Sequence, residues 1–278
     1  MNLYTPQQVV QARRRVTEEP GAKDIMEGIV SSAAPWLDRE DAAIADLIPD
    51  AAVPRSFSIN YVTGCPVHGS GPEGYSGYAM GGWKYDPFKD KWRVTCAVGG
   101  ESYPSNDFEA FYQSGMKDRS LLAGPFADDG WGWRAEGSAY KHWFVAYCCQ
   151  QLWGTIESGL SALSQAYVLT GDTRYAHKAL VMLDRIAEVY PDMDYCTQSM
   201  YATEMSPGYD GKIQNLIHET MTARRLCTAY DAVIDALPGD PTFGARAQET
   251  RDKLLRGVIQ GSLDGVYNGQ VRGNYGMH

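Results

Sequence analysis

Apolar residues recur at helical spacing near the start of the chain. Thr5 followed by Pro6 is a typical helix start, because Thr caps free amides and Pro tolerates the first helical position. The pattern predicts one helix from there to about Glu18. A second apolar run predicts another helix over residues 25–36.

Residues 49–137 have a different composition and hydrophobic pattern. They are rich in Gly, Pro, Trp and Tyr and lack long apolar periods, which predicts loops and small β elements. Residues 83–85 and 91–94 flank the turn-like Asp-Pro-Phe-Lys-Asp at 86–90, so we expect a β-hairpin there.

Helical spacing returns in the second half of the chain. Apolar residues step by three and four over residues 152–167 and again over 175–190, on either side of Gly171-Asp172, which predicts a helical hairpin. Further helices are expected over residues 213–234 and from Asp240-Pro241 to Leu263.

Paired helices with short links predict a mainly α fold, as a bundle, a solenoid or a toroid. The chain has no strict repeat period, which argues against a regular solenoid. An aromatic loop segment inside a helical frame favours a toroid with a cleft. We expect residues 1–278 to form a single, incomplete (α/α) toroid of antiparallel helical hairpins, with 49–137 as its loop-rich, small-β insertion.

Net charge, apolar stretches and cysteine count limit the classes of partner and environment that suit this protein. A net charge of −9 disfavours a general nucleic-acid binder. No stretch approaches the roughly 20 apolar residues of a membrane-spanning helix, and the polar start contains no signal peptide. Six cysteines are too few for a disulfide scaffold, and the adjacent Cys148 and Cys149 diverge on a helix, so we expect no bond between them.

Several motifs occur in a characteristic order. They are GCPVHG (64–69), CAVGG (96–100) leading to YPSN (103–106), DDGWGW (128–133), AYVLTGDTRY (166–175), AYD (229–231) and GNYGMH (273–278). In this order the chain resembles heparinase II/III-like polysaccharide lyases, from about Leu3 to the end. The resemblance implies an incomplete (α/α) toroid followed by a β-sandwich domain, and a periplasmic or secreted parent protein.

The resemblance also implies β-elimination next to a uronic acid in an anionic polysaccharide or oligosaccharide. The carboxylate must be neutralised, the C5 proton removed and the leaving O4 protonated. Asn274 stands where the family places its carboxylate-neutralising Asn, and His278, four residues later, can approach the same carboxylate. The alternative is that Asn274 is only a turn residue and that His278 belongs to a disordered chain end. The family's catalytic Tyr and a further His lie beyond this point, so we expect these residues alone to be inactive or feeble.

Substrate-binding candidates lie in two segments. The family places a His or Glu against the sugar carboxylate, at His218 or Glu219; adjacent helical residues diverge, so only one faces the cleft. Trp131 and Trp133 can stack on a sugar, and Arg134 can pair with a carboxylate or sulfate. The alternatives are core packing for the tryptophans, a solvated Glu and a core His.

Cys65 and His68 have the spacing of half a zinc site, and Cys96 with Gly99 occupies the place of the other half. Because a closed site needs four donors, these residues give only a weak indication of structural zinc. A Cys65–Cys96 bridge and free thiols are the alternatives, and we expect no other cofactor.

Two other functions remain open. A non-catalytic glycan-binding helical module would use Trp131 and Trp133 as stacking platforms. A helical-toroid glycoside hydrolase would need opposed carboxylates, for which Asp128 or Asp129 with Glu219 is the pair to test.

Overall fold

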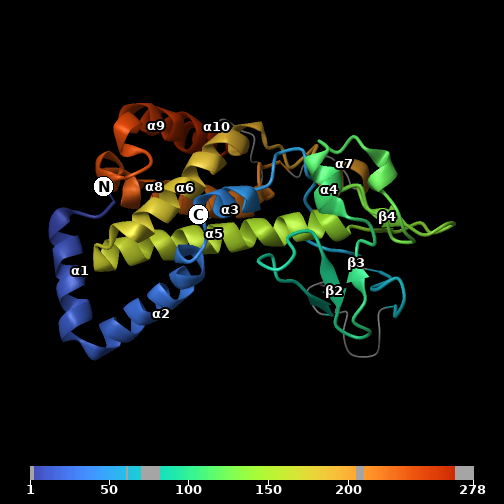
Figure 1. The fold of residues 1–278 in the computed structure, drawn as a ribbon, viewed down its shortest axis with the longest axis horizontal. Helices are drawn as coiled ribbons and strands as arrows, with labels where there is room; N and C mark the ends of the chain where they lie inside the picture. Colours follow the sequence, from blue (N-terminus) through green and yellow to red (C-terminus); the bar gives the residue numbers. More distant parts are fainter. Residues whose placement is uncertain (1–2, 61, 70–81, 205–209, 267–278) are drawn as a thin grey trace. The chain divides into compact units, whose positions relative to one another are not determined.

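The computed structural model describes residues 3–60, 62–69, 82–204 and 210–266 (Figure 1). It is mainly helical, with 58% helix and 6% strand, which confirms the predicted fold class. Closure of the helices into a toroid stays a prediction. No helix in the described part of the chain is both long and apolar enough to cross a bilayer.

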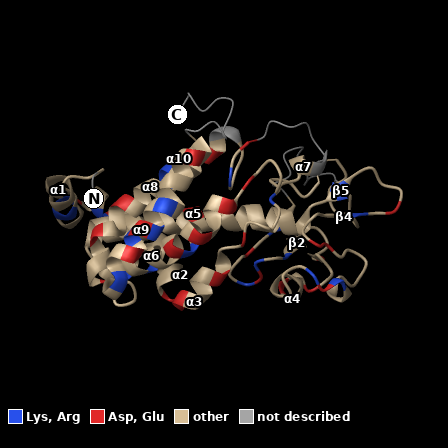
Figure 2. Ribbon diagram, turned by 90° about the horizontal axis from the view of Figure 1, so that it is seen from above, with Lys and Arg blue, Asp and Glu red and all other residues tan. Residues whose placement is uncertain are grey.

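The chain forms two compact units. The helical unit contains residues 1–49, 154–194 and 209–278, and the loop-rich unit contains residues 50–153 and 195–208. The loop-rich unit therefore extends past the predicted boundary at residue 137. The reason is that the first ten residues of the long helix α5 (Phe144–Thr170) contain no charged side chain and are almost entirely buried (Figure 2).

The helical unit begins with α1 (Pro6–Glu18) and α2 (Pro20–Leu37). Thr5 caps α1 as expected. Its hydroxyl accepts the Gln8 N–H, and the Gln8 side chain accepts the Thr5 N–H in return, which satisfies two amides. The α2 helix starts five residues before the predicted Ile25, because Pro20 is itself suited to the first helical position.

The predicted helical hairpin is present as α5 and α6 (Thr173–Val189). Gly171 has a positive φ of 77°, which ends α5 in the left-handed geometry that glycine tolerates. The Asp172 carboxylate then accepts the Arg174 N–H and starts α6.

Helix α6 lies at the centre of the helical unit. It packs against α2, α3 (Asp41–Leu47), α8 (Leu216–Val233), α9 (Ala247–Leu254) and the π-helix Leu255–Gln260, which continues into α10 (Gly261–Val266). A Cβ at Gly257 would lie 2.2 Å from the Ala187 carbonyl oxygen. Only glycine therefore allows the π-helix to approach α6 this closely.

The helix predicted to start at Asp240-Pro241 starts later, at Ala247. Two 3₁₀ turns come first, at Ile234–Gly239 and Gly244–Arg246. The Asp240 carboxylate accepts the N–H groups of Thr242 and Phe243, which closes a local turn instead of a helix. A further 3₁₀ turn, Tyr190–Asp192, follows α6.

The loop-rich unit has two small antiparallel sheets. The first has the order β1 (Trp83–Lys84), β2 (Val94–Cys96) and β3 (Ser102–Tyr103). Strands β1 and β2 form a hairpin where one was predicted, with Trp83 opposite Cys96, but its second strand begins at Val94 and not at residue 91. The second pairs β4 (Trp133–Arg134) with β5 (Lys141–His142). Short helices α4 (Phe108–Gln113), Arg119–Leu121 and α7 (Tyr201–Glu204) complete the unit.

Aromatic rings form much of the core of the loop-rich unit. Tyr103 stacks on Phe144 with ring centroids 4.7 Å apart, and Trp92 meets Phe108 edge-on at 5.2 Å. Because aromatic side chains bury a large area each, they compensate for strands of two and three residues.

Candidate functional site

Two tight turns of the loop-rich unit bring four potential metal ligands together. In the first turn, Cys65 and Gly69 exchange two backbone hydrogen bonds, with N···O distances of 3.1 and 2.8 Å. This closes the segment Cys-Pro-Val-His-Gly on itself, so that the side chains of Cys65 and His68 converge.

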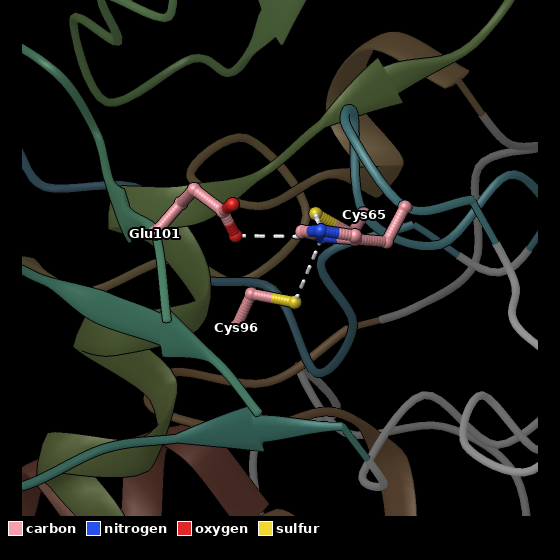
Figure 3. Close-up of side chains that lie close together, drawn as sticks. Cys65, Cys96 and Glu101 are labelled. Carbon is pink, nitrogen blue, oxygen red and sulfur yellow. Dashed lines mark hydrogen bonds and ion pairs between the residues drawn. The ribbon is translucent and has the colours of Figure 1, made fainter. Parts of the chain in front are cut away.

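The second turn connects β2 to β3. The Cys96 N–H donates to the Glu101 carbonyl at 2.8 Å, and the Gly100 N–H donates to the Cys96 carbonyl at 3.0 Å. Gly100 has a φ of 82°, which this turn requires. The side chains of Cys96 and Glu101 consequently point toward the imidazole of His68, to which the dashed lines in Figure 3 run.

The four side chains form one cluster, in which all ligand atoms lie within 4.8 Å of one another. Nδ1 of His68 is 3.6 Å from the sulfur of Cys65, 3.6 Å from the sulfur of Cys96 and 3.4 Å from Oε2 of Glu101. Both cysteines are buried, while the imidazole and the carboxylate are partly exposed.

The expected three donors are therefore brought together, and Glu101 joins them as a fourth. The sequence signal for Glu101 is its position just after the Gly-Gly turn, whereas the spacing of a zinc half-site places the fourth donor at residue 99. Gly99 contributes space instead of a ligand: a Cβ there would lie 2.0 Å from Cε1 of His68.

Asp128 organises the loop that carries the predicted sugar-stacking tryptophans. Its carboxylate is fully buried and accepts N–H groups from Gly130, Gly132 and Val145 at 2.8, 2.9 and 3.1 Å. Burial raises the pKa of Asp128 to about 6, against the opposing effect of these three donors. The carboxylate thus acts as an internal scaffold for the loop and for the start of α5.

The two tryptophans differ in their surroundings. Trp133 is half-buried and packs edge-on against Phe126 at 5.0 Å and tilted against His142 at 5.4 Å. Trp131 is also half-buried, and its carbonyl accepts a hydrogen bond from Lys141. Arg134 is exposed on β4. Trp133 therefore packs partly against neighbouring rings, and the substrate-binding roles of Trp131, Trp133 and Arg134 stay predictions.

His218 and Glu219 diverge as their spacing predicts. His218 is exposed in the first turn of α8. Glu219 is fully buried, and its two oxygens accept the Tyr190 hydroxyl at 2.6 Å and the Gln214 N–H at 2.8 Å. Burial raises the pKa of Glu219. A sugar contact by Glu219 would require these bonds to break, so His218 is the better placed of the two.

A further buried carboxylate, Glu157 on α5, was missed because a Glu within a helix normally faces solvent. Glu157 accepts hydrogen bonds from Thr222 at 2.8 Å and from Gln214 at 3.1 Å, and it forms an ion pair with Arg225 at 2.6 Å. This network joins α5 to α8 within the helical unit.

The helical unit also contains a groove of about 780 Å³, which we call the helical groove. It is lined by parts of α2, α5 and α8 and by Tyr4. Its polar lining groups are the hydroxyls of four serines and a threonine, one amide and two guanidinium groups: Ser32, Ser158, Ser161, Ser164, Thr228, Gln165, Arg224 and Arg225. No sequence motif marked this groove, because its residues come from separate helices.

The two predicted catalytic residues, Asn274 and His278, lie outside the described residues. Comparisons with protein-family models, curated proteins and solved structures find no match. The side chains and their geometry therefore carry the functional inference.

Proposed function

We propose that this chain is the helical part of a polysaccharide lyase of the heparinase II/III-like kind, which cleaves a uronic-acid-containing glycan by β-elimination. The supporting observation is the helical groove. Its described lining includes Arg224 and Arg225 and neither aspartate nor glutamate, in a chain whose net charge is −9. Because Arg225 is ion-paired with Glu157, Arg224 supplies the positive charge in this lining that would suit an anionic sugar.

The two arginines have different environments. Arg225 is held by its ion pair with the fully buried Glu157, whereas Arg224 is exposed on the same helix. A guanidinium binds a carboxylate through two parallel hydrogen bonds, and the hydroxyl and amide groups nearby suit the hydroxyls of a sugar. We assign Arg224 to the substrate carboxylate and Arg225 to a supporting position.

The groups that catalyse β-elimination would lie outside the described lining of the helical groove. In this proposal Asn274 neutralises the uronate as the C5 proton leaves, and His278 assists. The parent protein would be exported to the periplasm or secreted, where such polymers occur.

Binding to the 278-residue chain tests the proposal. We expect oligouronates to bind and neutral oligoglucans not to bind. Arg224→Ala should weaken oligouronate binding roughly ten- to hundredfold, because a charge-assisted pair contributes about 1.5–3 kcal/mol. Arg246→Ala is the matched control, since Arg246 is also exposed in the helical unit but does not line the groove. Equal affinity in the two variants, or no oligouronate binding, would refute the groove assignment.

A non-catalytic glycan-binding module is the second candidate. It is favoured by the lining of the helical groove, which in its described part offers many binding groups and, apart from Tyr4, no group suited to proton transfer. Ultraviolet absorbance of unsaturated uronate ends distinguishes the two candidates when it is measured on the parent protein, because the 278 residues alone are expected to be inactive or feeble in either case. Binding without such product would support the module.

The glycoside hydrolase alternative has no support from the described carboxylates. Asp128 and Glu219 are both fully buried and hydrogen bonded, so neither is available to a glycosidic bond. Asp129 is partly buried and lies 3.5 Å from Arg119.

A further inference from the structure

We infer that Cys65, His68, Cys96 and Glu101 bind one zinc ion in a closed, structural site of the loop-rich unit. This inference is independent of the proposed lyase function, because it rests on a different unit of the chain.

The distances between the donor atoms agree with tetrahedral zinc. Bond lengths of about 2.3 Å to sulfur, about 2.05 Å to nitrogen and about 2.0 Å to oxygen give tetrahedral edges of about 3.6 Å for S···N and about 3.3 Å for N···O. The two observed S···N distances are 3.6 Å, and the N···O distance is 3.4 Å. No other pair exceeds 4.8 Å, so a contraction of roughly 1 Å completes the tetrahedron.

The backbone next to the cluster leaves room for the ligands. A Cβ at Gly99 would lie 2.0 Å from the His68 ring and 2.4 Å from Oε2 of Glu101. Any other residue at this position would push both ligands apart. Oε2 of Glu101 is itself buried and accepts no hydrogen bond from the described residues. A buried carboxylate oxygen is costly without a partner, and a cation would satisfy it.

The donor set favours zinc over harder cations. Two thiolates and an imidazole are soft or intermediate ligands, which calcium and magnesium avoid. Both cysteines are free thiols in the structure, and binding would release their two protons to solvent as the Zn–S bonds form. The Tyr103 hydroxyl, 3.3 Å from the Cys65 sulfur, can donate a hydrogen bond that stabilises the thiolate.

A structural role follows from the number of ligands. Four protein donors fill a tetrahedral site and leave no open position for a water molecule or substrate. The ion would join the turn at residues 65–69 to the three-stranded sheet, two segments that are separate in the sequence.

Metal analysis of the whole chain tests the inference. The chain is purified without a histidine tag from zinc-supplemented cells under reducing conditions, desalted and examined by elemental mass spectrometry. We expect one zinc ion per chain. Cobalt added to the chelated protein should give the visible absorption of tetrahedral cobalt and a thiolate charge-transfer band.

Variants assign the metal to these residues. Cys96→Ser should lose the metal, and Glu101→Gln should weaken affinity by at least roughly tenfold, the lower bound for loss of even an outer-sphere partner. Cys227→Ser and Glu136→Gln, which alter a cysteine and a glutamate outside the cluster, should retain it. Glu101→Gln keeps the test decisive if Cys96→Ser fails to fold.

Three outcomes would overturn the inference. The first is a wild-type chain with far less than one zinc ion. The second is equal zinc affinity in Glu101→Gln and Glu136→Gln. The third is an intact mass that lacks two hydrogen atoms and shows a Cys65–Cys96 disulfide in place of the metal.

Discussion

In the helical unit, α6 packs against α2, α3, α8 and α9 along its length, whereas no described strand of the loop-rich unit exceeds three residues. Helices of this kind satisfy their own backbone hydrogen bonds and gain stability from burying one face. The loop-rich unit depends instead on contacts between distant side chains. These are the aromatic core, the amide contacts of Asp128 and the Cys-His-Cys-Glu cluster.

The helical unit also has polar links, but α6, which carries one of them, is already specified by its apolar periodicity. His177 on α6 lies between Asp41 and Asp240, at 2.8 and 2.9 Å. Burial acts to raise the pKa of Asp41, but the hydrogen bonds from Lys178 and His177 outweigh it and hold that pKa below its usual value. Loss of a polar link should therefore be local in the helical unit and widespread in the loop-rich unit.

Metal removal should have the largest effect. If zinc joins the two turns, chelation should destabilise the loop-rich unit by about 5 kcal/mol or more, since structural zinc contributes about 10–16 kcal/mol in small metal-dependent domains. Hydrogen exchange should accelerate in residues 65–69 and 94–103 and stay unchanged in α6. Equal acceleration in α6 would contradict the separation of the two units.

Glu219→Ala should cost the helical unit about 3 kcal/mol, because it leaves the buried Tyr190 hydroxyl and the Gln214 N–H unpaired. Urea unfolding measures the loss, with hydrogen exchange to locate it in α8. Glu219→Gln should lose less, since the amide keeps an acceptor. Exposed Glu136→Ala should stay within about 0.5 kcal/mol of wild type, and a similar loss in both alanine variants would refute the assigned role.

His142 should make the loop-rich unit sensitive to acid. Burial lowers the pKa of His142 to about 4, below the value of about 6.5 expected in an unfolded chain. Between these values only the unfolded state takes up the proton, so this contribution to stability is complete above pH 6.5 and is lost as pH falls toward 4.

The expected loss is roughly 2–3 kcal/mol. The free energy of unfolding of wild type minus that of His142→Gln isolates this contribution, measured in urea at several pH values. The difference should be constant above about pH 7 and shrink toward pH 4. A difference independent of pH would show that the imidazole is not held neutral.

Thr5→Ala should have the smallest effect, about 1 kcal/mol, because it removes one cap from an exposed helix end. Hydrogen exchange should report fraying confined to the first turn of α1. Gln7→Ala, an exposed change in the same turn that leaves the cap intact, should not cause fraying. Loss of protection beyond α1 would mean that this helix end is coupled to the rest of the unit.

The local patterns of the sequence predicted much of the helical unit. The Thr5-Pro6 start, the Gly171-Asp172 link and the apolar spacing of α5 and α6 depend on neighbouring residues, and all are present. Asp240 shows where such patterns fail. Residues such as Asp can either start a helix or close a turn. At Asp240 the carboxylate accepts the N–H groups of Thr242 and Phe243, and this contact produces a turn.

The candidate sites depend on contacts between side chains that are far apart in the sequence, and these contacts cannot be predicted from local spacing. Spacing alone identified Cys65, His68 and Cys96, but Glu101 was recognisable only once the Gly-Gly turn had brought it to His68. The division at the middle of α5, the burial of Glu157 and the helical groove likewise come from packing between distant helices. The sequence by itself determined where several helices form, how they are capped and that the fold is mainly α, since these features depend on interactions between neighbouring residues. Only the tertiary structure decided which carboxylates are buried and which side chains meet.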